Sequence, residues 1–261
     1  MSSDPAFTKR PITIIRSPVE TLLTDAILLA KLAHEHKGNP PTGENEETVC
    51  ARASVLSSVL TLEAAANTCA ERALGLPKRV QRLVTNARPM FSRFDIILET
   101  LGRPVLPQGD ARVQRAAAMV SKVRNRYVHP VLQEQAALHT AFLEGGGIIE
   151  PSPGQRVQPL GLSALPREWV AEDAATALRA LCEFLDLFLF EACGFTDDRV
   201  TFLVHDTELR DGREIARSGP LWEAAFQART SWGMAPRFLG WLFREMESRG
   251  VAWPDGSTSA I

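Results

Sequence analysis

The chain has 261 residues, of which 45% are apolar, and its 29 basic and 31 acidic side chains give a net charge of −2. This composition excludes a disordered chain, a fibrous repeat and a chain that is polybasic throughout. A folded chain of this length removes about 70–75% of its unfolded surface from water, so we expect a full core that needs neither disulfides nor metal. The chain forms one large domain, or a main domain with a small annex.

The apolar segments and the cysteines predict a cytoplasmic protein. The N-terminus lacks the long apolar core of a signal peptide, and the most apolar run, residues 178–190, is interrupted by charged residues. No contact with a membrane is therefore expected. The cysteines have no CxxC spacing and lie in apolar, helix-like surroundings. We expect reduced core residues, with no metal site and no cofactor, at Cys50, Cys69, Cys182 and Cys193.

The first half of the chain predicts a succession of helices. Residues 1–18 contain three prolines and are interpreted as a tail or arm. Apolar residues then recur with helical spacing over 19–37, 46–74 and 78–101, and glycine and proline residues separate these segments. Pro89 is expected to kink or divide the third of them.

A fourth helix is predicted from Asp110, a suitable N-cap, to about residue 128, because Pro130 disfavours helical geometry at the residue before it. Residues 131–143 are interpreted as a short helix. A loop follows to residue 166, with a small hairpin around residues 152–154. The most apolar helix, 168–193, is expected at the centre of the core.

The character of the sequence changes after Gly194. Residues 201–204 are β-branched or apolar and predict a strand, and Asp211-Gly212 is typical of a hairpin turn. Two short helices are expected at 221–229 and 237–249. The fold class is therefore predicted to be all-α: an antiparallel, up-and-down helical bundle over 19–193, with a small C-terminal appendage over 194–261 that contains a short β-hairpin.

Polar residues interrupt the apolar faces of two predicted helices. On a helical wheel, Arg124 falls inside the stripe formed by Val113, Ala117 and Val120, while Glu63 and Asn67 fall inside the stripe of the helix 46–74. An unpaired buried charge is costly, so a guanidinium in this position needs a partner or a ligand. Either Glu63 and Arg124 form a structural pair, with Asn67 satisfied nearby, or these groups line a polar cleft that binds a ligand.

The stretch Arg124-Asn125-Arg126-Tyr127-Val128-His129 resembles the motif of the HEPN superfamily, helical-bundle proteins of which many are metal-independent RNases. That motif is an arginine, often followed by a polar residue, with a histidine four to six residues further on. The resemblance implies that Arg124, Asn125 and His129 are catalytic, that Glu63 or Asn67 supports the arginine, and that two copies of the chain form a homodimer around a shared cleft. Tyr127 is expected to be a core residue with its hydroxyl at the edge of that cleft.

The distribution of charge favours RNA as the partner. Residues 77–126 carry eleven basic and three acidic side chains, a local net charge of +8, whereas the rest of the chain carries −10. Basic residues around the motif are what binding of a phosphate backbone requires. We expect RNA contacts from Arg115, Lys122 and Arg126.

The sequence supports two hypotheses of function. The first is a metal-independent endoribonuclease of stress response or phage defence, in which Arg124 stabilises the scissile phosphate and His129 is the general acid or base. The alternative is a non-catalytic bundle that binds RNA or protein, with Glu63 and Arg124 as a structural pair. The dipeptide His205-Asp206 resembles that of HD-type phosphohydrolases, but the further ligands that those enzymes need have only His139 as a candidate upstream.

Overall fold

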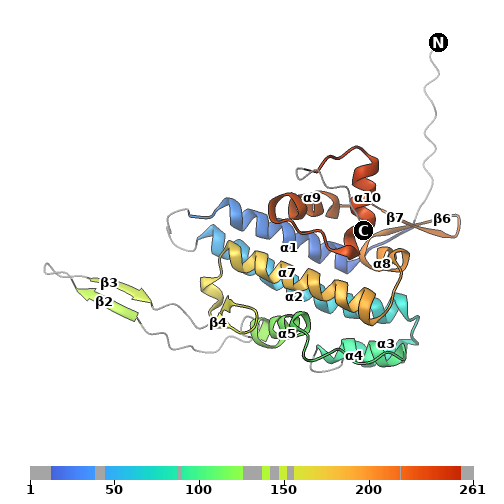
Figure 1. Ribbon diagram of the computed structural model, residues 1–261, viewed down its shortest axis with the longest axis horizontal. Coiled ribbons are helices and arrows are strands. Elements are labelled where there is room, and N and C mark those ends of the chain that lie inside the picture. The colour runs from blue at the N-terminus through green and yellow to red at the C-terminus, as the bar shows by residue number, and fades with distance from the viewer. Residues whose placement is uncertain are drawn as a thin grey trace, which may run out of the picture.

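The computed structural model describes residues 13–38, 45–86, 90–125, 137–141, 147–151, 156–217 and 219–253, and the chain is mostly helical with small antiparallel sheets (Figure 1). Three long helices lie side by side at its centre: α1 (Pro18–Glu35), α2 (Glu46–Thr68) and α7 (Ala171–Asp186). Helices α1 and α2 begin within one residue of their predicted starts, where Ser17 and Asn45 cap them through side-chain bonds to backbone N–H groups, whereas α7 begins three residues after its predicted start at 168.

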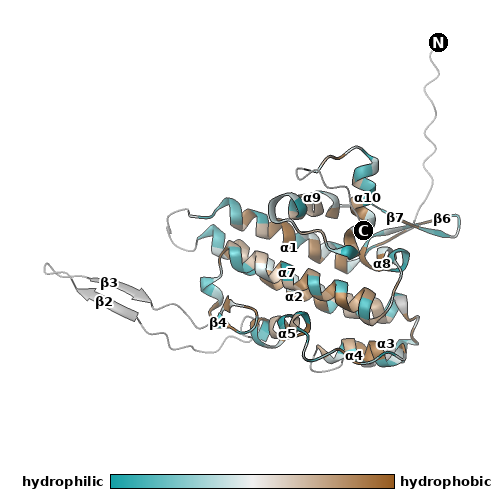
Figure 2. Cartoon of the chain, viewed as in Figure 1, coloured by the Kyte–Doolittle hydropathy of each residue, from teal (hydrophilic) through white to brown (hydrophobic). Residues whose placement is uncertain are grey.

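The core lies between these helices. Apolar residues face one another where α1, α2 and α7 meet, and polar residues cover the outer surfaces (Figure 2). Phe94 contacts Phe184 and Phe188 edge to face, with ring centroids 4.9 and 4.7 Å apart. The segment Glu46–Arg72 is long and apolar enough to cross a membrane by length and composition, but more than half of its most apolar stretch is buried inside the protein. Burial of this kind is typical of a core helix.

Two short helices follow α2. The last turn of α2 continues as a π-helical turn, η1 (Cys69–Ala73), before α3 (Lys78–Asn86) and α4 (Ser92–Thr100). The predicted division of the segment 78–101 is confirmed, since two separate helices, α3 and α4, occupy the sequence before and after the predicted break.

The predicted helix that begins after Asp110 is observed as α5 (Ala111–Ala118) followed by the π-helical η2 (Met119–Arg124). The Asp110 carboxylate caps it by accepting a bond from the N–H of Arg112 at 2.8 Å. The N-terminal end of α5 lies by the C-terminal end of α7, because Arg112 reaches Glu191 of the π-helical η4 (Leu187–Ala192), which extends α7.

The region after η2 differs from the prediction. The short helix expected over 131–143 is wrong at 137–141, where β2 (Ala137–Ala141) pairs with β3 (Gly147–Pro151), whose β-branched pair Ile148 and Ile149 suits a strand. The hairpin expected around 152–154 lies outside the described residues, and the described strands before and after it belong to different sheets. Here β4 (Arg156–Val157) pairs instead with β5 (Leu162–Ser163), ahead of a 3-10 turn, η3 (Pro166–Glu168).

The C-terminal segment confirms the hairpin and the two helices but not the strand at 201–204. Those residues belong to α8 (Asp197–Val204), which Thr196 caps and two acidic residues open. The strands β6 (Thr207–Arg210) and β7 (Arg213–Ala216) flank the predicted turn, where Asp211 and Gly212 have positive φ. The last helical elements are α9 (Leu221–Trp232), the 3-10 turn η5 (Arg237–Leu239) and α10 (Gly240–Ser248).

Part of the expected N-terminal tail is structured. Thr13–Ile15 form β1, which pairs with β6 to complete a three-stranded sheet. Helix α9 also packs against α1. The C-terminal segment is therefore joined to β1 and α1 through both a sheet and a helix contact.

Candidate functional site

Arg124 and Asn125 lie at the C-terminal end of η2. The buried seam of this helix contains Val113, Val120 and Val123, so Arg124 lies beside the seam and is half-buried, and Asn125 is exposed. The wheel placed Arg124 inside the seam because it assumed α-helical geometry, whereas a π turn contains more residues and rotates those that follow it. The Asn125 amide donates to the Ser121 carbonyl at 2.9 Å.

The predicted pair between Glu63 and Arg124 is not formed among the described side chains. Glu63 Oε1 instead accepts a bond from Arg93 Nη1 at 2.8 Å, and Asn67 Oδ1 lies 3.3 Å from the same nitrogen. Arg93 is 8% exposed. The polar residues on the apolar face of α2 therefore serve a guanidinium of α4, a residue that the sequence reasoning missed.

Within the described ranges, the Arg124 guanidinium has neither an ion pair nor a hydrogen bond. It stands at a helix end beside Lys122, whose ammonium donates to the Gln158 carbonyl at 3.0 Å. Arg124 therefore lies beside an apolar seam, and its charge is available to an anionic ligand. Three of the predicted site residues lie outside the described residues: Arg126, Tyr127 and His129.

The basic segment 77–126 is partly neutralised by acidic residues from other helices. Counting these three outside carboxylates reduces the local net charge from +8 to +5. The ion pairs are Arg93 with Glu63, Arg112 with Glu191, and Arg115 with Glu183. Arg115, predicted to contact RNA, is therefore held by a carboxylate of α7.

A second polar cluster lies where β1, α1 and α8 meet. Asp206 accepts bonds from the backbone N–H of Ser17 at 2.7 Å and from the Arg16 guanidinium at 2.5 Å, and its own N–H donates to Glu20 Oε2 at 2.5 Å. His205 is 0% exposed, and its Nδ1 lies 3.9 Å from Glu20 Oε2. These contacts connect the start of α1 to the C-terminal segment.

Burial determines the protonation of this cluster. It lowers the pKa of His205 to about 4 and raises the pKa of the Glu20 carboxyl. His205 is therefore neutral and closed to solvent, which is unsuitable for acid–base exchange with a substrate. Among the described residues no group of three His, Cys, Asp or Glu side chains is placed to hold a metal ion. His205 and Asp206 therefore lack, within this part of the chain, the further ligands that an HD-type metal site needs.

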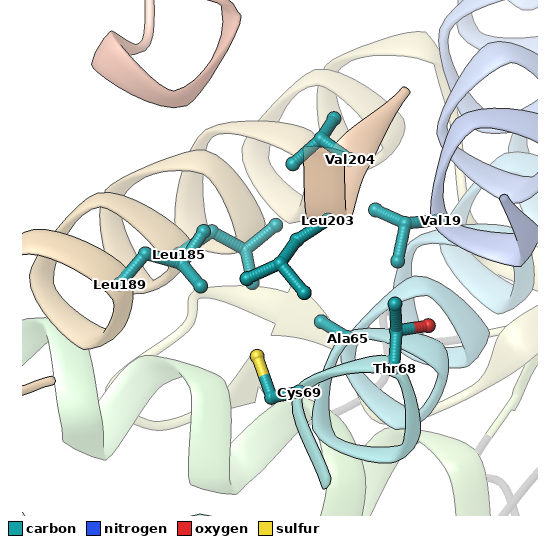
Figure 3. A pocket seen from close by; sticks show the side chains of 8 residues that line it. All are labelled: Val19, Ala65, Thr68, Cys69, Leu185, Leu189, Leu203 and Val204. Carbon is teal, nitrogen blue, oxygen red and sulfur yellow. The ribbon is translucent and has the colours of Figure 1, made fainter. Parts of the chain in front are cut away.

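The described cavities are unsuited to a buried ligand. The core cavity between α2, α7 and α8 has a volume of about 10 Å³, too small for more than one water molecule, and apolar side chains point into it (Figure 3). Two open hollows of about 330 and 260 Å³ share Glu183 and Asp186 of α7. Asp186 is engaged by the backbone N–H groups of Arg237 and Phe238, at 2.9 Å each.

The cysteines are structural. Cys69, Cys182 and Cys193 are buried as predicted, whereas Cys50 is partly exposed. Burial raises the pKa of all four thiols, that of Cys193 to about 12. Since thiolates are the reactive form, these groups are poor nucleophiles and poor metal ligands at neutral pH.

Comparison with known proteins yields no relative. No protein-family model, no curated protein and no solved structure matches this chain.

Proposed function

We propose that this protein is a cytoplasmic, metal-independent endoribonuclease built on an antiparallel helical bundle of the HEPN type. The observation that carries the proposal is the state of Arg124, a guanidinium beside an apolar seam that has no partner among the described side chains. The competing structural explanation needed Glu63 as the partner of Arg124, and Glu63 is bound to Arg93.

Arg124 is suited to the charge that develops during RNA cleavage. Its planar fork of N–H donors binds two non-bridging phosphate oxygens and stabilises the pentavalent transition state without a metal ion. Asn125, exposed beside it, positions the phosphate or His129. Both roles are carried out by adjacent residues at the C-terminal end of η2.

His129 supplies the proton transfers in this proposal. As a general base it removes the proton of the ribose 2′-OH, whose oxygen then attacks the adjacent phosphorus and displaces the 5′-oxygen. A second histidine, from the other copy in a homodimer, protonates that leaving oxygen. The products are a 2′,3′-cyclic phosphate and a free 5′-OH, and no water is consumed. DNA lacks the nucleophile and is not cut.

The proposal is tested by incubating the purified protein with labelled RNA in EDTA. We expect cleavage to persist in the chelator, to disappear in His129→Ala and to fall by at least about 100-fold in Arg124→Gln, the usual scale for loss of an acid–base group or a transition-state donor. His34→Ala and Arg167→Gln are matched controls because both side chains are exposed.

Four outcomes bear on these hypotheses. Equal cleavage by wild type and His129→Ala, or cleavage that EDTA abolishes, overturns the nuclease proposal. Binding of RNA without cleavage supports the non-catalytic module. Light scattering tests the homodimer, and a strict monomer that cuts RNA contradicts the shared site.

A further inference from the structure

The exposed face of α3 is strongly basic. Lys78, Arg79 and Arg82 are all exposed, and Val84, on the opposite side of the helix, is buried. On a helical wheel the three cations fall within an arc of about 100°. The helix contains no acidic residue. We call these three side chains the α3 patch.

The α3 patch retains its charge in the folded protein. Elsewhere in the segment 77–126, cross-helix carboxylates hold the guanidinium groups of Arg93, Arg112 and Arg115. None of the three cations of the α3 patch has an ion pair with a described residue. Among the described residues of this segment, the cations left without an ion pair are the α3 patch, Lys122 and Arg124 at the end of η2, and the exposed Arg103 between α4 and α5.

The placement of these cations does not favour the helix itself. Lys78 and Arg79 occupy the first turn of α3, where the positive end of the helix dipole repels cations. Lys78 and Arg82 are four residues apart, a spacing at which like charges repel. A helix optimised for stability alone would carry acidic residues here, so the cations indicate an anionic partner.

The α3 patch and Arg124 lie near opposite ends of α2. Helix α3 follows the C-terminal end of α2 after the π-helical turn η1 and a short connection. At the other end, Lys122 of η2 contacts Gln158, the residue after β4. Arg156 of β4 forms an ion pair with Asp173 in the first turn of α7, and the first residue of α7 bonds to Glu47 in the first turn of α2. These contacts connect η2 to the N-terminal end of α2. The 23 residues of α2 span about 34 Å.

We infer that the α3 patch is a second phosphate-binding surface, which contacts the same RNA strand that Arg124 engages, about ten nucleotides away. This inference rests on the proposed function. The distance follows from the length of α2 and a rise of about 3.4 Å per stacked nucleotide. Helices α3, α4 and α5 follow one another along one edge of the molecule, which gives such a strand a continuous path (Figure 1). The substrate class is a long RNA rather than a short oligonucleotide.

The test compares binding of two uncleavable RNAs, 2′-O-methylated strands of about 6 and about 20 nucleotides, by fluorescence anisotropy. The variant is Lys78→Gln/Arg79→Gln/Arg82→Gln. The control, Arg167→Gln/Arg213→Gln/Arg217→Gln, removes the same charge from exposed positions elsewhere. The uncleavable strands separate binding from catalysis, and circular dichroism confirms that both variants are folded.

We expect the α3 variant to lose at least about tenfold in affinity for the long RNA at 0.15 M salt, and its log–log salt slope to decrease by about two, as three lost phosphate contacts require. The affinity of the α3 variant for the short RNA, and the affinity of the control variant for the long RNA, should each change by less than about twofold. The inference is overturned if the α3 variant and the control variant lose affinity for the long RNA equally, or if the α3 variant loses affinity equally for the long and the short RNA. It is also overturned if polyglutamate displaces the long RNA from wild type and from the α3 variant equally.

Failure of this inference is distinguishable from failure of the nuclease proposal. If wild type cuts RNA through His129 while the α3 variant binds long RNA normally, the nuclease stands and the α3 patch is only a solvated face. If no RNA is cut but the α3 variant loses affinity for the long strand alone, the patch stands and the nuclease proposal falls.

Discussion

Replacement of Arg93 by Met tests where the charge of Glu63 is neutralised. Arg93 Nη1 lies 2.8 Å from Glu63 Oε1 and 3.3 Å from Asn67 Oδ1, and the Arg93 side chain is 10% exposed. Methionine keeps much of the packing volume and removes the donor. Arg93→Met therefore leaves a carboxylate and an amide oxygen without their shared partner.

The expected loss of stability follows from the exposure of the two groups. Breaking a fully buried ion pair by removing one partner costs about 3–5 kcal/mol. The Glu63 side chain is 27% exposed, so water compensates part of this loss. We expect Arg93→Met to lower the free energy of unfolding by about 2–3 kcal/mol.

Two further variants make the prediction specific. Arg124→Met removes a guanidinium with no partner among the described residues, so it is expected to cost less than about 1 kcal/mol. Glu63→Met in the Arg93→Met background removes the orphaned charge, and apolar replacement of both partners is often neutral. The double variant should regain most of the lost stability, with a coupling energy of at least about 1.5 kcal/mol.

The measurement is urea unfolding followed by circular dichroism at neutral pH, with a shared m value for the variants. A larger loss for Arg124→Met than for Arg93→Met would refute the reasoning. It would show that Arg124 is the structural cation, and the main support for the nuclease would be lost with it.

Three other predictions concern the rest of the fold. Because the folded-state pKa of His205 is about 4, well below its unfolded value, the free energy of unfolding should fall by at most about 3 kcal/mol as the pH decreases from about 6.5 to 4. The raised pKa of Glu20 acts in the opposite sense. In urea titrations at several pH values, Glu20→Gln should therefore make this fall steeper, and His205→Phe should make it flatter. A methyl group on Gly219 would lie 2.2 Å from Glu20 Oε1, so Gly219→Ala should lower the melting temperature, whereas Gly109→Ala, with open space around it, should not. A thiol reagent should label Cys50 first in the native protein, at a slow rate because its pKa is raised, and reach the other thiols only on unfolding; labelling of a second thiol as fast as that of Cys50 would contradict the burial of Cys69, Cys182 and Cys193.

The helices were predictable because their signals are local. The cap at Asp110, the proline at position 89 and the spacing of apolar residues are signals that depend on neighbours within one or two turns. The hairpin at Asp211-Gly212 has the same property, since positive φ at the turn needs these residue types. Local chemistry thus determines where these elements begin and end.

Residues 201–204 show where composition misleads. Their β-branched and apolar side chains favour a strand, but Thr196 and the acidic residues after it form a helix start that carries the chain through Val204. Burial against α1 and α2 then outweighs the weak strand propensity. The pairing of β1 with β6 had no local signal at all, because it joins residues nearly 200 positions apart.

The candidate site was predictable in composition but not in pairing. A helical wheel identifies the face of α2 that carries Glu63 and Asn67, but it contains no information on which helix packs there. Arg93 precedes Phe94 on α4, and only the packing of α4 on α2 brings its guanidinium to that face. The π turn in η2 added a second error, because it rotated Arg124 out of the seam that an ideal α-helix predicts.

The local charge of +8 also depends on packing for its meaning. A window of sequence counts every basic residue equally, but carboxylates from α2, α7 and η4 neutralise three of them across helix interfaces. Such paired arginines contribute little to attraction of a polyanion, because binding RNA would require breaking their existing bonds. The described cations of the segment 77–126 that keep their charge are the α3 patch, Arg103, Lys122 and Arg124, and the separation of the α3 patch from Arg124 along α2 makes the length of the RNA a sharper test of function than the overall charge.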